Sequence, residues 1–272
     1  MIAPADFDYV RQLVVRNSAI VLDPGKEYLV ESRLLPVARK EGFASIQEMV
    51  RRMQSVPSNG LHTRVIEAMT TNETLFFRDI HPFETLRTAA LPAILDRRSL
   101  ERKLNILCAA CSTGQEPYSL SMLLREHFPQ LASWSVRIIG CDLSHDVLDR
   151  AKAGRYSQLE VGRGLPTSYL LKYFKRDGIE WEIDQSIRRM VEFVPANLAG
   201  PWPIFPVFDI IFMRNVLIYF DLETKKQIIA KARRQMRPDG FLILGAAETT
   251  FNIDESFERY EPGKAGWYRL RG

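Results

Sequence analysis

The sequence predicts an α/β protein in which a small helical bundle precedes a mostly parallel sheet. Strand-like and helix-like runs alternate from about residue 100, whereas the first 75 or so residues show only helical periodicity. Such alternation is typical of a parallel sheet with helices on both faces. The run 208–213 is apolar on both sides, as expected of a central strand.

Apolar side chains at helical spacing predict the bundle. Pro36 lies inside the second pattern and should kink or divide that helix. Glu48, three residues after Ser45, predicts a capping box. We expect the four helices to begin near Phe7 and Val30, at Ser45 and near Leu61.

The sheet domain is predicted from apolar runs separated by helical patterns. A Pro-Asp-Gly turn is expected at residues 237–240. Strands are expected at 104–109, 136–141, 190–194, 208–213 and 240–246, and helices near 117–128, 144–153, 166–174 and 222–236.

Composition limits the classes of function. No run approaches the roughly 18 apolar residues that span a bilayer, and the first residues lack a signal-peptide pattern. Three cysteines without framework spacing fit a reducing cytoplasm. They and the four histidines show no pairing typical of a metal site, so we expect none. A net charge of +4 falls short of a committed nucleic-acid binder.

A loop of small residues, 110–114, follows the first expected strand and precedes a helix. Such a turn exposes backbone N–H groups to a ligand. Because Gly114 is its one glycine, the dinucleotide fingerprint is absent and a pyrophosphate is disfavoured. The second strand ends on Asp142, where a carboxylate can accept hydrogen bonds from ribose hydroxyls. These features favour a nucleoside without phosphates, and S-adenosylmethionine is the obvious candidate. Asp142 could instead cap the next helix, although Ser144 offers a competing cap.

Two further polar residues have alternative interpretations. Glu116 is either an ordinary first-turn acid, favoured by the helix dipole, or a contact for the cationic methionine end of the cofactor. Asn197 either reads the adenine edge or forms a turn after a strand.

The segment 214–221 follows the central strand, where open sheets place active-site groups. It is not the Asn/Asp-Pro-Pro-Tyr type, which disfavours amino-group methylation. The segment 70–79 is either a linker whose Phe76 and Phe77 enter the core, or a site in which Arg78 holds an anionic carboxylate beside the methyl donor.

These segments together resemble the CheR-type chemotaxis receptor glutamate O-methyltransferases. The resemblance implies an all-α N-terminal domain, with linker start, at 1–78 and a Rossmann-like S-adenosylmethionine-dependent methyltransferase domain at 79–272. The motifs that carry it are TNETLFFR at 71–78, STGQEPYS at 112–119, GCD at 140–142, ANL at 196–198 and RNVLIYF at 214–220.

The resemblance also implies functional residues. Arg78 and Tyr219 should lie closest to the point of methyl transfer. The basic second helix, with Lys26, Arg33, Arg39 and Lys40, is either a solvated face or the docking face for the acidic helical bundle of the chemoreceptor cytoplasmic domain. The residues implied to line the cofactor site are Asn72, Thr74, Arg78, Glu116, Asp142, Asn197, Leu198, Arg214 and Asn215.

Some members of the family bind a receptor tether through a β-subdomain with a glycine-containing insertion. The corresponding stretch, 174–183, is short with one glycine, so a hairpin and tether-independent activity are expected. We expect a cytoplasmic monomer that neither binds nucleic acid nor inserts into a membrane. The alternatives are a methyltransferase for another acceptor and a non-catalytic S-adenosylmethionine-binding module.

An acceptor glutamate has a pKa of about 4.3 and is already ionised at neutral pH, so no general base is required. Catalysis should then come mainly from positioning, which can supply about 7–11 kcal/mol.

Overall fold

The computed structural model describes residues 2–263 and 266–272. The chain forms two compact units: one contains the residues up to Thr71 together with Tyr219–Thr224, and the other contains Asn72–Ile218 and Lys225–Gly272. No helix in the described ranges is both long and apolar enough to cross a bilayer.

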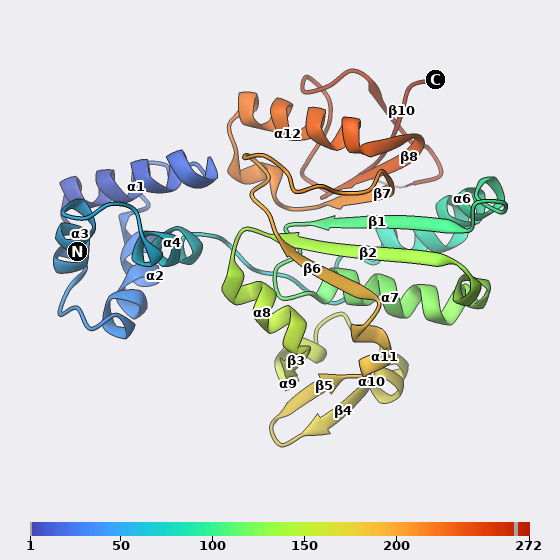
Figure 1. Ribbon diagram of the computed structural model, residues 1–272, viewed down its shortest axis with the longest axis horizontal. Helices are drawn as coiled ribbons and strands as arrows, with labels where there is room; N and C mark the ends of the chain where they lie inside the picture. The colour runs from blue at the N-terminus through green and yellow to red at the C-terminus, as the bar shows by residue number, and fades with distance from the viewer. Residues whose placement is uncertain (1, 264–265) are drawn as a thin grey trace. The chain divides into compact units, whose positions relative to one another are not determined.

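The first unit contains the four predicted helices, drawn in blue to teal in Figure 1. Pro36 lies inside a helix that continues to Lys40, so it does not divide the helix. The Ser45 hydroxyl accepts the Glu48 N–H, which confirms the predicted N-terminus. The helices are α1 (Pro4–Ser18), α2 (Glu27–Lys40), α3 (Ile46–Gln54) and α4 (Gly60–Ala68), and their core includes Val10, Val14, Leu34, Met49 and Val65.

Arg33 on α2 is bound within this unit. Its guanidinium donates to the carbonyls of Met69 and Thr70 at 2.7 and 3.0 Å, and to the Thr71 hydroxyl at 2.9 Å. These carbonyls follow α4, where a helix leaves backbone acceptors unsatisfied. Arg33 therefore ties α2 to the end of α4, in contrast to both interpretations of this helix, as a solvated face or as a docking face.

The second unit contains a seven-stranded sheet in the order β6-β2-β1-β7-β8-β10-β9. All pairs from β6 to β8 are parallel, and only β10 is antiparallel to its neighbours β8 and β9. The mostly parallel sheet is thus confirmed. The strands are β1 (Lys103–Ala109), β2 (Ser135–Asp142), β6 (Val191–Pro195), β7 (Phe208–Met213), β8 (Met236–Leu244), β9 (Phe257–Arg259) and β10 (Trp267–Leu270).

The expected turn at 237–240 is wrong, because β8 already begins at Met236. Its pairing with β7 shifts register between Phe208 and Ile210, so the Pro-Asp-Gly segment is accommodated as an irregularity of the strand. Beside it, Asp209 is 1% exposed and accepts hydrogen bonds from Arg98 Nε and the Asn105 N–H, both at 2.9 Å.

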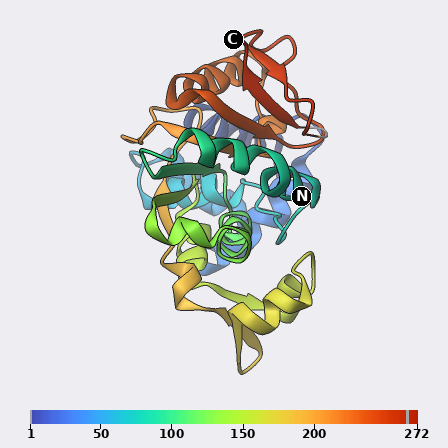
Figure 2. The same ribbon diagram turned by 90° about the vertical axis from the view of Figure 1, so that its right-hand side faces the viewer.

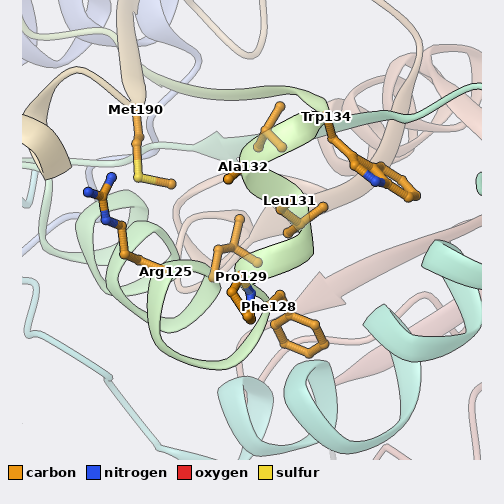
Figure 3. A pocket seen from close by; sticks show the side chains of 9 residues that line it. Arg125, Phe128, Pro129, Leu131, Ala132, Trp134 and Met190 are labelled. Carbon is orange, nitrogen blue, oxygen red and sulfur yellow. The ribbon is translucent and has the colours of Figure 1, made fainter.

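A cavity of about 430 Å³ lies at the amino-terminal edge of the sheet, where β2 begins (Figure 3). It lies beside the end of α7 (Gln115–His127) and the short helix η2 (Pro129–Ser133). Its lining is apolar except for Arg125, and includes Phe128, Leu131, Trp134 and Met190.

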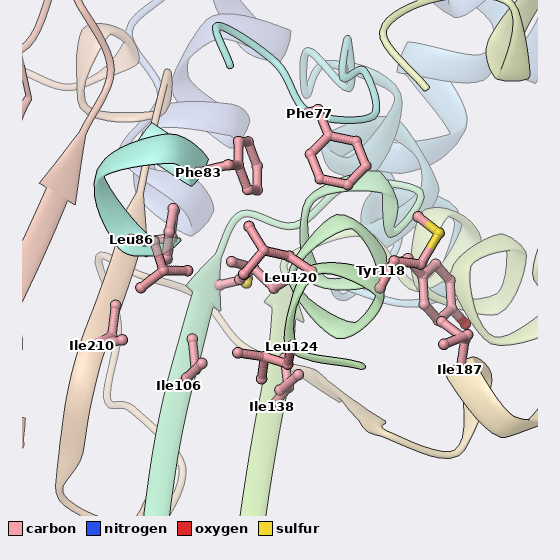
Figure 4. Close-up of a cluster of buried hydrophobic side chains, with 14 of the residues drawn as sticks. Phe77, Phe83, Leu86, Ile106, Tyr118, Leu120, Leu124, Ile138, Ile187 and Ile210 are labelled. Carbon is pink, nitrogen blue, oxygen red and sulfur yellow. The ribbon is translucent and has the colours of Figure 1, made fainter. Parts of the chain in front are cut away.

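The main core lies between the sheet and the helices α5 (His81–Thr85), η1 (Leu86–Ala90), α6 (Leu91–Arg97) and α7. Figure 4 shows Phe83, Leu86 and Leu120 over the strand residues Ile106 and Ile210. The alternating residues of the same strands point to the opposite face and are also buried, so both faces of the sheet are covered. These include Leu107, Ile139 and Ile211. The helices α8 (His145–Ala153) and α12 (Leu222–Gln235) also flank this sheet in Figure 1.

A second, three-stranded antiparallel sheet has the order β3-β5-β4 (yellow-green to yellow in Figures 1 and 2). The expected hairpin is confirmed as β4 (Phe174–Asp177) and β5 (Glu180–Ile183), with Gly178 at φ 61° in its turn. The third strand, β3 (Arg155–Ser157), was not expected. The helices α9 (Gln158–Val161), α10 (Thr167–Tyr173) and α11 (Gln185–Arg188) surround this sheet.

Candidate functional site

The loop after β1 has a strained backbone. Ala110 and Ser112 have φ of 55° and 51°, a region that non-glycine residues seldom occupy. Gly114, at φ 92°, is the N-cap residue of α7, and a Cβ there would come within 3.0–3.2 Å of side chains that pack against it. The Tyr156 hydroxyl, from β3, donates to the Thr113 carbonyl at 2.8 Å and thereby fixes the loop to the three-stranded sheet.

Asp142 lies at the carboxyl end of β2, beside this loop. Its Oδ2 accepts the Ser112 N–H at 2.9 Å, and its Oδ1 accepts the Ser144 N–H at 3.1 Å. The cap of α8 is the Ser144 hydroxyl, which accepts the Val147 N–H. Asp142 is therefore the neighbour of the loop rather than the helix cap, and its contact with ribose stays a prediction.

Glu116 pairs with Arg214. Arg214 Nη1 donates to Glu116 Oε2 at 2.9 Å, and the two side chains are 2% and 12% exposed. Burial raises the pKa of the Glu116 carboxyl above its ordinary value, while Arg214 acts in the opposite direction. Glu116 is thus more than a solvated first-turn acid, because it is the counter-ion of a buried arginine.

The same arginine holds the segment that carries Arg78. Arg214 Nη2 donates to Asp79 Oδ2 at 2.6 Å and to the Arg78 carbonyl at 3.0 Å. Phe77, Asp79 and Ile80 have φ of 48°, 65° and 29°, so this turn is held in a rare conformation. The Arg78 guanidinium itself donates to a neutral acceptor, the Glu73 carbonyl, at 3.2 Å.

Phe76 and Phe77 belong to the core, as one interpretation of their segment predicted. They are 0% and 8% exposed. Phe76 makes edge-to-face contacts with Tyr156 and Phe174, at centroid distances of 5.0 and 5.6 Å. Earlier in the same segment, the Asn72 carbonyl accepts a hydrogen bond from the Ser112 hydroxyl at 2.7 Å. The start of the segment 72–78, which includes Thr74, therefore lies against the loop after β1.

The loop after β7 is fixed by a residue that the sequence analysis missed, Glu248. Its carboxylate accepts the N–H groups of Asn215, Val216, Leu217 and Gly245 at 2.7–2.8 Å. Asn215 adopts φ 57°, and its Oδ1 is buried without a hydrogen-bond partner among the described residues. The signal in the sequence was an acid just after the expected strand 240–246, the same signal that identified Asp142.

The Asn197–Leu198 segment is held by Lys231, also missed. Asn197 Oδ1 accepts the Ala199 N–H at 3.0 Å, which agrees with the turn-former interpretation and leaves the adenine contact a prediction. Lys231 Nζ donates at 2.8–2.9 Å to three successive carbonyls, those of Leu198, Ala199 and Gly200. Burial lowers the pKa of Lys231.

Tyr219 belongs to the helical unit, where its carbonyl accepts the Val21 N–H at 3.0 Å. Its role in methyl transfer stays a prediction. Among the predicted residues, hydrogen bonds link Asp142 through Ser112 to the Asn72 carbonyl, and link Arg214 to Glu116 and to the Arg78 carbonyl. Asn215 follows Arg214 directly in the chain and is bound by Glu248.

The edge suits a cationic nucleoside such as S-adenosylmethionine. It supplies carboxylates from Glu116 and Asp142, and the buried Asn215 Oδ1 has no hydrogen-bond partner among the described residues, so an ammonium group could donate to it. The described residues contain no group of three or more His, Cys, Asp or Glu able to hold a metal. Burial raises the pKa of the Cys108 and Cys111 thiols, which does not favour a catalytic thiolate. The apolar cavity of Figure 3 lies at the opposite edge of the sheet and lacks acidic groups.

Comparisons with known proteins show the family of the chain. The family model described as the CheR methyltransferase all-alpha domain matches residues 5–70, and that of the CheR methyltransferase SAM binding domain matches residues 72–264. Chemotaxis protein methyltransferase 1 of Pseudomonas aeruginosa is 40% identical over 99% of both chains. Chemotaxis protein methyltransferase Cher2 of Pseudomonas putida is 39% identical over 93% of both.

Among solved structures, a TehB-like SAM-dependent methyltransferase from Corynebacterium glutamicum aligns with a TM-score of 0.39 and 14% identity, over 71% of this chain and 97% of that one. The family matches cover both compact units, and they agree with the motifs on which the resemblance was based. The chain therefore belongs to the CheR methyltransferase family, and S-adenosylmethionine is its cofactor.

Proposed function

We propose that this protein transfers a methyl group from S-adenosylmethionine to glutamate side chains on the cytoplasmic helical bundle of a chemoreceptor, forming glutamyl methyl esters. The observation that carries the proposal is a contrast between two arginines. Arg214 is buried and already paired with Glu116 and Asp79, whereas the Arg78 guanidinium donates to a neutral carbonyl. Arg78 is therefore the arginine suited to receive a carboxylate from outside.

S-adenosylmethionine supplies a methyl group on a cationic sulfur. Asp142, Glu116 and Asn215 would hold it through their acceptors, and Asn197 and Leu198 would flank the adenine. Arg78 would orient the acceptor carboxylate through paired hydrogen bonds, with the Tyr219 hydroxyl as a second donor. Since the acceptor is ionised at neutral pH, the residues need only position it and exclude water.

The receptor as acceptor is supported by the relatives, which are named chemotaxis protein methyltransferases. It is also supported by exposed basic residues on the helical unit, which suit an acidic helical partner. Arg33 does not belong to this proposed docking face, because its guanidinium binds carbonyls at the end of α4. The basic residues of the helical unit that are exposed include Arg39 and Lys40 on α2 and Arg51 and Arg52 on α3.

We further propose that the activity does not require a receptor tether. The β4–β5 hairpin has a short turn with the single glycine Gly178, without the glycine-containing insertion associated with tether binding. Receptor fragments with and without their C-terminal peptide should then be methylated at similar rates.

The test is to incubate the purified protein with receptor signalling domains and labelled donor, and to map base-labile methyl esters by mass spectrometry. Arg78→Ala should abolish most of the transfer, and Arg78→Lys should restore little because a lysine cannot form the paired hydrogen bonds. Near-normal turnover by Arg78→Ala would contradict its role. Label on RNA would indicate another acceptor, and donor binding without release of S-adenosylhomocysteine would indicate a non-catalytic module.

A further inference from the structure

Glu248 makes an unusual set of hydrogen bonds at the carboxyl edge of the sheet. Its Oε1 accepts the N–H groups of Val216 and Leu217, and its Oε2 accepts those of Asn215 and Gly245. The side chain lies on the chain after β8, but three of its donors lie on the loop after β7. The residue is 7% exposed, so these bonds replace most of its hydration.

We propose that Glu248 is a positioning residue for cofactor binding: its carboxylate holds the β7 loop in the conformation that presents Asn215 to S-adenosylmethionine. The proposal rests on cofactor binding alone and is independent of which acceptor is methylated.

The geometry around Gly245 shows how closely the three residues fit. A Cβ on Gly245 would lie 2.7 Å from Asn215 Nδ2 and 2.8 Å from Glu248 Oε2, distances that real side chains do not allow. Glu248 therefore holds the end of β8 and the loop that carries Asn215 in a fixed position relative to each other. Any side chain at position 245 must displace either the carboxylate or the amide.

The consequence of this arrangement is the conformation of Asn215. It is held at φ 57°, and its Oδ1 is a buried acceptor without a partner in the described parts of the chain. Such an unsatisfied group is costly unless a ligand supplies a donor. Glu248 satisfies the backbone N–H groups at 215–217, so that the loop keeps this conformation before the ligand arrives.

Glu248→Gln tests the proposal because it keeps the shape of the side chain and changes its chemistry. A glutamine has one acceptor oxygen, and its NH₂ would face N–H donors that it cannot accept. We expect the Kd for S-adenosylhomocysteine, measured by calorimetry, to rise at least tenfold. The KM for donor should rise while the KM for receptor stays within twofold of wild type.

Asp209→Asn is the matched control. Asp209 is also a buried carboxylate that accepts a backbone N–H, but it lies at the amino-terminal edge. We expect this variant to lose thermal stability and yet bind S-adenosylhomocysteine within twofold of wild type. If both variants lost affinity equally, general destabilisation would explain the result and the positioning role would be overturned.

Gly245→Ala provides a second route in case Glu248→Gln does not fold. It retains the carboxylate and forces it or the Asn215 amide to move, so a tenfold weaker binding is again expected. Wild-type affinity in either Glu248→Gln or Gly245→Ala would overturn the proposal.

Discussion

Arg214→Met removes the positive charge from a buried ion pair and keeps an apolar stem of similar length. Breaking a buried pair by removing one partner costs about 3–5 kcal/mol, because the remaining charge stays buried. Glu116 is that remaining charge, at 12% exposure. The second carboxylate, Asp79, is 50% exposed and should add at most about 1 kcal/mol. We therefore expect a loss of about 3–5 kcal/mol in the free energy of unfolding at neutral pH.

This loss should depend on pH. Burial already raises the pKa of Glu116 above its ordinary value, with Arg214 opposing the shift, so removing Arg214 raises the pKa further. As pH falls, the folded variant then takes up a proton that the unfolded chain does not, and folding is favoured. The difference in stability between wild type and Arg214→Met should therefore shrink as pH falls from 8 towards 5.

The assay is urea unfolding followed by circular dichroism at pH 8 and pH 5.5. The double variant Glu116→Gln/Arg214→Met removes both charges, and should be more stable than Arg214→Met alone. A difference from wild type below about 1 kcal/mol, typical of an exposed pair, or one that is equal at both pH values, would refute the account of Arg214 as the counter-ion of a buried Glu116.

Three other outcomes are expected. Asp142→Asn removes a charged acceptor next to Ser112. Because a hydrogen bond to a charged group is worth about 1.5–3 kcal/mol, the Kd for S-adenosylhomocysteine, measured by calorimetry, should rise roughly 10- to 100-fold. An unchanged Kd would contradict a hydrogen bond between Asp142 and the ribose. Burial raises the pKa of Cys141 to about 12, so thiol reagents at pH 8 should label the cysteines only after denaturation, and rapid labelling of the native protein would contradict their burial. Arg33→Glu should lower the melting temperature, whereas Arg39→Glu should raise the KM for receptor without lowering the melting temperature. The reverse pattern would indicate that Arg33 contacts the receptor.

The parts of the fold that could be predicted are those with a strong local signal. The strands from β1 to β7 of the large sheet are apolar runs, and Ser45 and Glu48 mark a helix start through contacts three residues apart. The strands β3, β9 and β10 are three or four residues long, too short for a periodicity to develop. The start of β8 was missed because Pro238 and Gly240 are typical of turns, and only pairing with β7 makes this segment a strand.

The candidate site shows the same division. Asp142 and the loop at 110–114 could be identified because a carboxylate and small residues at strand ends are local features. The partners of Arg214 could not, since Glu116 lies 98 residues earlier in the chain. Likewise, Arg33 reaches carbonyls 36 and 37 residues away. Sequence therefore indicated some of the residues at the edge, whereas the structure shows that Arg214 and Glu116 form an ion pair and that Glu248 binds the loop after β7.

The hydrogen bond from the Tyr156 hydroxyl to the Thr113 carbonyl joins the three-stranded sheet to the loop after β1. Phe76 packs against Tyr156 and Phe174, and therefore ties the same small sheet to the Arg78 segment. The three-stranded sheet is thus an integral part of the methyltransferase domain. A truncated protein without this sheet would lose the contacts that it makes with the loop after β1 and with Phe76.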